Sequence, residues 1–266
     1  LRSGAVCHVG IEPGRSPDGA TSRQGVHHGP GSLRITDLGY FDVAVFAAMA
    51  KSGEYFLTRL LFGTRVRLPD GGPVAILTWL CRQAGRFVDQ PIQLGQEQQL
   101  PCRLIAWRVP EEQANRRRHK LRRDYKGKYG KEPSAERLAW CDGTILVSNV
   151  PAPLMTPEEA VVLYRARWQV ELLFKRWKSQ GRVAVLKGST VVRQMVGLGS
   201  RLLAALLQHW VVVSSAWGDP SKSLGKACEA IRRFVTRIAA ALDQRAELEQ
   251  VLADFGRIDV LVNNAG

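Results

Sequence analysis

The sequence predicts an α/β fold, with strands in its first half and helices in its second. Short runs of β-favouring residues, such as Tyr55–Arg59, alternate with turn signals up to about residue 150. Apolar residues at helical spacing dominate from residue 157 onward. The 266 residues are 45% hydrophobic, so the chain can build one large domain or two smaller ones.

The first elements form a strand, a turn, a helix and a second strand. Leu33 and Ile35 lie on a short predicted strand that ends at Asp37, and Val43–Lys51 predicts a helix before the strand Tyr55–Arg59. A carboxylate at a strand end, opening onto a loop, is well placed to offer its oxygens to a metal ion. In the alternative interpretation, Asp37 only caps the following turn.

The middle of the chain predicts further strands. Short β-like runs occupy Arg65–Leu68, Phe87–Leu94 and Leu104–Val109. Thr144–Val150 predicts one more strand, after which prolines interrupt the chain. Thr156 is then expected to begin a helix as its N-cap, with Glu159 completing a capping box.

The segment from Tyr164 to Lys178 separates into two stripes when placed on a helix. Arg167, Glu171 and Lys178 all fall within about 60° of Tyr164. A neighbouring apolar arc is expected to face a core, and it contains Leu163, Ala166, Val170, Leu173, Phe174 and Trp177. A carboxylate aligned with two cations and a phenol suits a site that holds a metal ion beside phosphates. The alternative is an amphipathic helix on which Arg167 and Glu171 form a surface ion pair.

Charge indicates a polyanionic partner. Lys and Arg total 38 against 24 acidic residues, which gives a formal net charge of +14. Nucleic acid is the leading candidate, because an anionic membrane partner would call for a basic amphipathic anchor or a lipidation signal. The apolar stretches Val43–Met49 and Leu202–Val213 are shorter than a bilayer crossing requires and are predicted to be buried helices.

The most cationic stretch runs from Glu111 to Lys131. Its candidate DNA contacts are Arg116, Arg117, Arg118, Lys120, Arg122 and Arg123. A solvated helix without a partner is the alternative. Because the run is nearly all of one sign, self-repulsion is expected to oppose its order in the absence of a polyanion.

The cysteines and histidines do not predict a metal centre. The five cysteines are scattered without a C-x-x-C pair, which favours a reducing cytoplasm over a zinc site or a disulfide framework. His27 and His28 are adjacent in a Gly-rich segment and are expected to belong to a solvated loop.

Two motifs carry a resemblance to a known family. The spacing Tyr164-x2-Arg167-x3-Glu171-x6-Lys178 resembles the YREK signature of the DDE transposases of the insertion-sequence-four type. The segment Gly31–Asp42 is similar to that family's second catalytic aspartate motif, Asp-x-Gly-Tyr. The two motifs also occur in the order that the family shows.

The resemblance implies an α/β fold with an RNase H-like core, a β-rich insertion and a helical C-terminal part. The expected division is 1–55 for the first part of the core, 56–145 for the insertion, 146–190 for the returning core, 191–254 for C-terminal helices and 255–266 for a tail. The tail ends in Asn263-Asn264-Ala265-Gly266 and resembles a short-chain dehydrogenase motif. The Gly-rich turn and the Tyr-x3-Lys pair of that fold are missing, so the tail is expected to be unrelated or artefactual.

The resemblance also implies the chemistry, which is cut-and-paste DNA transposition. Asp37 and Glu171 are expected to ligate Mg²⁺ or Mn²⁺, and Tyr164, Arg167 and Lys178 to hold phosphates. The implied partner is DNA at transposon ends, and a homodimer on the DNA is compatible with the resemblance. The implied location is the bacterial cytoplasm, and the nucleoid when DNA is bound. The family's first catalytic aspartate is expected before Leu1, so impaired catalysis is predicted for these 266 residues.

Two rival functions remain open. The first is a non-catalytic, basic nucleic-acid-binding protein, in which the Arg116–Lys131 run is the only functional feature. It gives no reason for Asp37 and Glu171 to share a metal ion. The second is a dehydrogenase fragment, which rests on the tail alone and requires nicotinamide binding.

Overall fold

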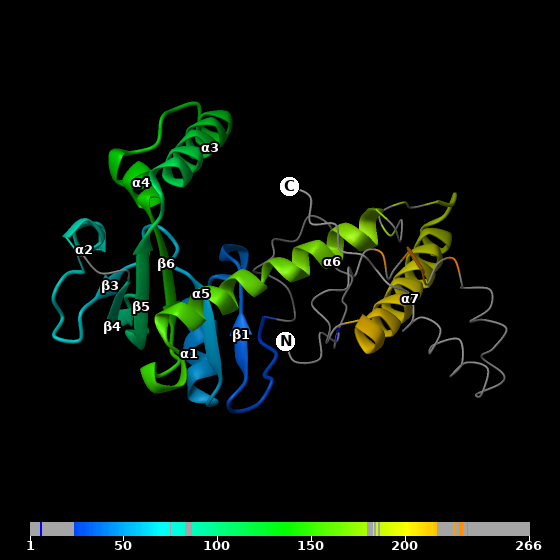
Figure 1. The fold of residues 1–266 in the computed structure, drawn as a ribbon, viewed down its shortest axis with the longest axis horizontal. Helices are drawn as coiled ribbons and strands as arrows, with labels where there is room; N and C mark the ends of the chain where they lie inside the picture. The colour runs from blue at the N-terminus through cyan, green and yellow to red at the C-terminus, as the bar shows by residue number, and fades with distance from the viewer. Residues whose placement is uncertain are drawn as a thin grey trace. The chain divides into compact units, whose positions relative to one another are not determined.

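The computed structural model describes residues 24–74, 76–82, 87–179 and 187–216, together with a few isolated positions (Figure 1). Contacts divide the chain into two compact units, of which one ends at Trp168 and the other resumes at Gln169. Each unit is described by itself. Of the region 191–254, where C-terminal helices were expected, the part after residue 216 lies almost entirely outside the described residues, and the tail lies wholly outside them.

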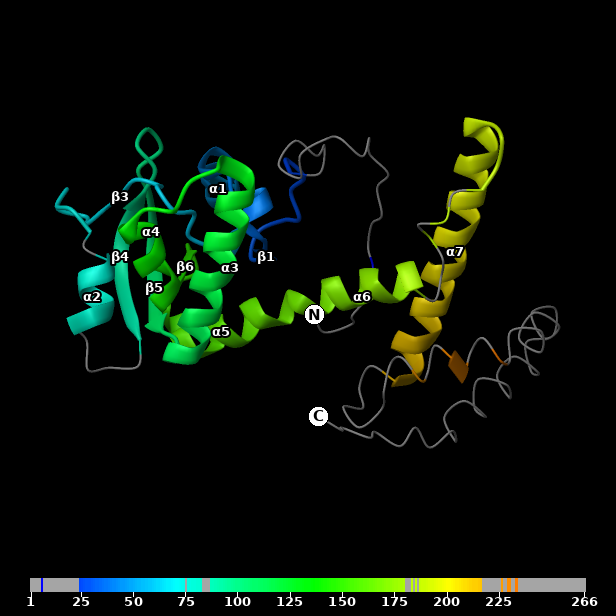
Figure 2. The same cartoon turned by 90° about the horizontal axis from the view of Figure 1, so that it is seen from above.

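The first unit is built on a mixed six-stranded sheet. Its strands, in spatial order, are β1 (Leu33–Ile35), β2 (Tyr55–Arg59), β6 (Gly143–Ser148), β5 (Leu100–Arg108), β4 (Val88–Leu94) and β3 (Val66–Arg67). β1 runs parallel to β2, and every other neighbouring pair is antiparallel. The strands of the middle region therefore extend the same sheet that carries β1 and β2 (Figures 1 and 2).

Helices α1 (Val43–Lys51) and α2 (Ile76–Arg82) pack on one face of this sheet. Phe46 of α1 stacks on Phe56 of β2 with ring centroids 4.5 Å apart, and both are buried. Successive side chains of a strand point to opposite faces. Leu57 of β2 accordingly joins the core on the other face.

Helix α5 (Pro157–Ala166) packs on that second face, where Ala160 meets Leu57, Ile105 and Leu146. The predicted capping box is confirmed: Glu159 N donates to Thr156 Oγ1, and Thr156 N donates to the Glu159 carboxylate. Local sequence thus fixes where α5 begins, and the apolar face fixes how it lies on the sheet.

Helix α3 (Glu111–Tyr129) contains the cationic stretch and ends at Gly130, whose φ of +66° suits glycine. The expected disorder from self-repulsion is not what the structure shows. Two of its arginines bond to residues 142–144, outside the helix: Arg117 donates to Gly143 O and Thr144 Oγ1, and Arg118 pairs with Asp142 as well as with Glu111 of α3 itself. These contacts offset the repulsion and hold α3 against β6 and the turn before it. The remaining short elements of this unit are η2 (Leu38–Tyr40), α4 (Ala135–Ala139), η3 (Trp140–Asp142) and η4 (Ala152–Leu154).

The helix expected through Tyr164–Lys178 is present, with an interruption at Arg167 between α5 and α6 (Trp168–Ser179). Of the six residues expected to face a core, Trp177 is buried. Val170 and Phe174, in contrast, are about half exposed, so that part of the expectation is wrong.

Helix α7 (Val191–Ala216) begins where the C-terminal helices were expected to begin and includes the apolar stretch Leu202–Val213. Its Val191–Val213 part has a mean hydropathy of 1.4 and is long and apolar enough to cross a bilayer, and 17% of that window is buried. The prediction of a buried helix is therefore not met among the described residues. A core helix of a water-soluble protein meets the same length and composition criteria, so these two properties do not assign α7 to a membrane.

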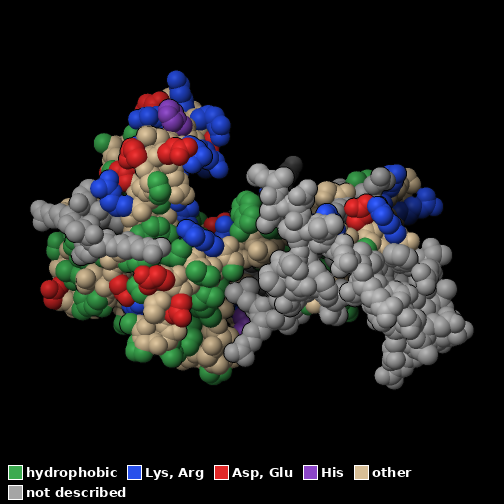
Figure 3. All heavy atoms as spheres, in the orientation of Figure 1, with side chains coloured by type: hydrophobic (Ala, Val, Ile, Leu, Met, Phe, Trp, Pro, Cys, Tyr) green, Lys and Arg blue, Asp and Glu red, His purple; other side chains and the backbone are tan. Residues whose placement is uncertain are grey.

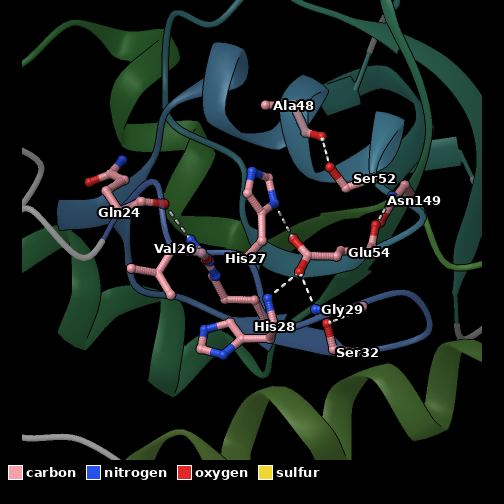
Figure 4. A network of polar contacts seen from close by, with 11 residues as sticks. Gln24, Val26, His27, His28, Gly29, Ser32, Ala48, Ser52, Glu54 and Asn149 are labelled. Carbon is pink, nitrogen blue, oxygen red and sulfur yellow. Dashed lines mark hydrogen bonds and ion pairs between the residues drawn. The ribbon is translucent and has the colours of Figure 1, made fainter.

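A buried carboxylate ties the segment before β1 to the start of β2 (Figure 4). The Glu54 side chain is shielded from solvent and accepts hydrogen bonds from the backbone N–H groups of His28 and Gly29. His27 Nδ1 lies 3.0 Å from the other carboxylate oxygen. The loop that contains His27 and His28 was expected to be solvated, and the structure shows that hydrogen bonds to Glu54 hold it in place. The anchor sits directly upstream of the strand that ends at Asp37.

We expect the contribution of Glu54 to stability to disappear in acid. Burial alone would raise its pKa, but the hydrogen bond with His27 and those from the His28 and Gly29 backbone outweigh burial and lower the pKa below its usual 4.5. A group with a lowered folded-state pKa stabilises above the unfolded value and loses that effect as pH falls through the folded one. Urea midpoints between pH 7 and pH 3 should fall less steeply for Glu54→Gln than for the wild type. Glu97→Gln, at an exposed turn, is the control and should follow the wild-type curve.

Candidate nucleic acid and metal site

Asp37 lies at the carboxyl end of β1, as predicted. Backbone pairing to β2 continues one residue past the strand, because Thr36 N donates to Leu57 O at 3.1 Å. Asp37 is the next residue, and its Oδ1 accepts from Leu38 N at 2.8 Å, so it does cap the η2 turn. Its side chain remains 49% exposed. The cap uses one carboxylate oxygen, and Oδ2 faces away from the turn toward a cation.

That cation is Arg167, at the end of α5. Its Nη1 lies 3.5 Å from Asp37 Oδ2, and its side chain is 22% exposed. The guanidinium carbon lies 5.7 Å from the centre of the Tyr164 ring. The structure thus brings together three residues that the sequence singled out from two motifs far apart in the chain.

Tyr164 presents its hydroxyl within this cluster. The oxygen is buried beside the Arg167 side chain, which interacts with it. Burial raises the pKa of Tyr164, and the nearby Asp37 charge adds to that effect, so the phenol remains a proton donor at neutral pH. A buried donor beside a guanidinium is suited to an anionic oxygen atom.

Arg59 is a neighbour that sequence reasoning did not select. It ends β2, and continuing the β1–β2 register by two residues places it beside Asp37. Alternation along β2 directs its side chain to the face that α5 covers. Its charge opposes the rise in the Tyr164 pKa and is the second cause, after burial, of a lowered pKa at Arg117. A cation at the end of a strand next to an acidic strand end was the available sequence signal.

Glu171 and Lys178 lie on α6, beyond the boundary between the two units. Glu171 is partly buried and Lys178 is exposed. Across the described part of the chain, no three His, Cys, Asp or Glu side chains gather closely enough to hold a metal ion. Within its own unit, Asp37 is therefore the carboxylate that stands beside the phosphate-binding candidates.

The candidate DNA contacts on α3 divide into an anchored and an outward group. Arg117 and Arg118 are partly buried and bonded to β6 and to η3, as described above. Arg116, Lys120 and Arg123 are exposed and lie within about 60° of one another around the helix. Arg122 is also exposed and lies 4.0 Å from Glu132. Figure 3 shows Lys and Arg side chains gathered over the α3 region. The outward group forms a cationic stripe, by which we mean Arg116, Lys120 and Arg123.

Comparisons with known proteins identify a family and several similar transposases. Residues 1–207 match the family described as "Transposase DDE domain". The chain is 28% identical over 200 residues to the transposase for insertion sequence element IS231F of Bacillus thuringiensis subsp. israelensis, covering 67% of this chain and 41% of that protein. It is 25% identical over 201 residues to the transposase for IS1151 of Clostridium perfringens, covering 69% and 42%.

A third relative is the putative transposase InsL for IS186A of Escherichia coli strain K12, which is 33% identical over 125 residues, covering 47% of this chain and 33% of that protein. The chain spans less than half the length of these curated relatives. The family match covers more than half of the chain and includes both motifs. The chain therefore belongs to the transposase DDE domain family.

Proposed function

We propose that this chain carries catalytic residues of an insertion-sequence transposase, which cuts and transfers DNA strands with the help of divalent metal ions. The observation that carries the proposal is the meeting of Asp37, Tyr164 and Arg167 at the end of β1. One motif supplies a carboxylate and the other supplies a cation and a phenol, as a site for metal-assisted phosphate chemistry requires.

Asp37 and Glu171 are the proposed ligands of Mg²⁺ or Mn²⁺. Asp37 fits this role, since it offers a half-exposed, hard oxygen ligand that already attracts a cation. When bound, the ions would supply an activated water or 3′-hydroxyl and neutralise charge on the phosphate. Glu171 enters the proposal through its motif spacing rather than through a contact.

Arg167, Lys178 and Tyr164 are the proposed phosphate-positioning residues. The Tyr164 hydroxyl is protonated at neutral pH, as a tyrosine ordinarily is, and burial raises its pKa further, so it can donate to a phosphate oxygen. Contacts of this kind fix the register of the DNA backbone and carry no sequence information. Arg59, on the neighbouring strand, adds positive charge to the same face.

The wider context follows the same proposal. The sheet and its covering helices would be an RNase H-like core, with the β3–β5 region inserted between the core strands and helices at the C-terminal end. The partner would be DNA at transposon ends, and the protein would bind it either as one chain or as a homodimer. The protein would act in the bacterial cytoplasm, at the nucleoid when it is bound to DNA.

The proposal is tested with purified protein and an end-labelled duplex that carries the terminus of the insertion sequence. The expected result is binding of the duplex together with uptake of Mn²⁺. Strand cleavage is predicted to be impaired, and whatever cleavage occurs should require Mg²⁺ or Mn²⁺ and stop with a chelator. DNA binding without any uptake of Mn²⁺ by the protein would contradict the proposal. That outcome would favour a basic nucleic-acid-binding protein without a metal site.

The cationic stripe on α3 predicts a second measurable effect. If Lys120 and Arg123 each neutralise one phosphate, the double alanine variant should reduce the slope of log affinity against log salt by about 2. Fluorescence anisotropy with a short duplex between 50 and 200 mM salt measures this slope. Lys51→Ala removes an exposed cation at the end of α1 and serves as the control. Equal slopes for all three proteins would exclude the stripe as a DNA contact.

A further inference from the structure

One ion pair in the proposed site joins Asp37, the proposed metal ligand, to Arg167, which is proposed to bind phosphate. Asp37 Oδ2 and Arg167 Nη1 are 3.5 Å apart, whereas a charge-assisted hydrogen bond between such groups is typically about 2.7–2.9 Å. The other oxygen of Asp37 is used by the Leu38 N–H. The contact is therefore longer than such a hydrogen bond, and the Asp37 side chain in it is about half exposed.

A pair of this kind is easily exchanged. Exposed ion pairs contribute little to stability, because water and salt screen them and the side chains lose freedom. The guanidinium of Arg167 also lies over the Tyr164 ring, so it has a second favourable neighbour when it leaves the carboxylate. Helix α5 is held to the sheet by its capping box and its apolar face, independently of the Asp37–Arg167 contact.

We propose that Arg167 is a stand-in cation, which occupies the metal-binding oxygen of Asp37 until a divalent ion takes that oxygen and Arg167 turns to a DNA phosphate. This inference rests on the proposed function, because it assumes that Asp37 binds metal. In this inference Arg167 has two successive partners, first the Asp37 carboxylate and then a DNA phosphate, and both are negatively charged. The carboxylate thereby stays partly neutralised before the ion arrives.

The consequence is a coupling between metal and DNA. Arg167 competes with the ion for Asp37, so the ion must displace it, and a displaced Arg167 is available to DNA. Linkage requires that DNA then favours metal binding by the same factor by which metal favours DNA binding. Without Arg167, the metal should bind more tightly on its own, and the coupling should vanish.

Arg59 offers a matched control for this idea. It carries the same charge, ends the neighbouring strand and acts on Tyr164, but no ion pair joins it to Asp37 in the described part of the chain. Arg59→Ala therefore removes local positive charge without removing a competitor. Arg167→Lys keeps the charge but replaces the planar guanidinium by a single ammonium group.

The first measurement is a Mn²⁺ titration of the purified protein, with free Mn²⁺ followed by electron paramagnetic resonance. Arg167→Ala should bind Mn²⁺ about threefold more tightly than the wild type, the size expected for release of one exposed ion pair. Arg59→Ala should change the affinity less, and Arg167→Lys should lie between wild type and Arg167→Ala. Equal gains for Arg167→Ala and Arg59→Ala would overturn the inference and leave only general electrostatic repulsion.

The second measurement is DNA affinity, by anisotropy, with and without Ca²⁺ at constant ionic strength. The ratio of the two affinities should be about threefold higher for the wild type than for Arg167→Ala, and screening of the DNA by Ca²⁺ cancels in that comparison. Identical ratios would refute the coupling while the metal site stands. Failure of Asp37→Asn to reduce Mn²⁺ binding would instead refute the proposed function itself.

Discussion

Replacing Asp37 by asparagine is expected to weaken Mn²⁺ binding at least about a hundredfold, beyond the 10- to 100-fold that loss of a supporting residue typically costs a metal site. The amide keeps the size of the side chain and still offers an oxygen to the Leu38 N–H, so η2 should remain intact. What is lost is the negative charge that attracts the ion. Strand cleavage should fall about a thousandfold or more for the same reason, which corresponds to about 4 kcal/mol of transition-state stabilisation.

Asp42→Asn is the matched control for this variant. Asp42 lies five residues further along the chain and caps α1 by accepting from Ala44 N and Val45 N. Asparagine caps helices about as well as aspartate, so the fold should be retained. Mn²⁺ affinity within twofold of wild type is expected for this control. Equal losses in both variants would mean that the ion responds to the overall charge of the region rather than to a ligand.

Removing the Arg103 side chain is expected to lower the free energy of unfolding by about 3–5 kcal/mol, the range for breaking one side of a buried ion pair. Arg103 is 12% exposed and holds both oxygens of Asp89, which is 29% exposed, on the adjacent strand. Its Nη1 also donates to the carbonyl oxygens of Val150 and Met155, at 3.0 and 2.9 Å. Alanine would leave a carboxylate and two carbonyl groups without this donor.

Urea unfolding of Arg103→Ala, followed by circular dichroism, measures this loss. Arg108→Ala removes the same side chain from an exposed position of the same strand, and a change below about 0.5 kcal/mol is expected there. The double variant Asp89→Ala/Arg103→Ala should recover part of the loss, because no unpaired charge remains. A loss below 1 kcal/mol for Arg103→Ala would show that water replaces the guanidinium without penalty.

Arg103 also bears on the candidate site. The Val150–Met155 segment connects β6 to α5, and α5 carries Tyr164 and ends next to Arg167. Holding that connection at both ends fixes where α5 leaves the sheet. A destabilised Arg103 variant that still folds should therefore also weaken the contact between Arg167 and Asp37.

The elements around Asp37 were predictable because their signals are local. Val43–Lys51 and Tyr55–Arg59 have the predicted bounds, and the capping box at Thr156 forms as expected. Alternation, helix caps and glycine turns act over a few residues, so the sequence displays them directly. The ordering of α3 in the absence of a polyanion was not predicted, since it depends on contacts with β6 and with Asp142 rather than on the charges of the helix itself.

The role of each charge was not predictable from composition. A net charge of +14 favours a polyanionic partner, yet it does not show which arginines are already engaged within the protein. Arg103 and Arg117 hold elements together, whereas Lys120 and Arg123 point outward. Glu54 had no recognisable motif, because its partners are backbone N–H groups and one histidine that lie 25 to 27 residues away.

The sequence by itself determined the strand and helix around each motif, the spacing of Tyr164, Arg167, Glu171 and Lys178, and the family. Only the tertiary structure decided that Asp37 and Arg167 form an ion pair, that Tyr164 buries its hydroxyl beside them, and that Arg59 stands on the same face. The physical reason is the separation along the chain between the residues that interact. Caps and periodicity are written into neighbouring residues, whereas an ion pair between distant segments exists only after the sheet and its covering helix have packed.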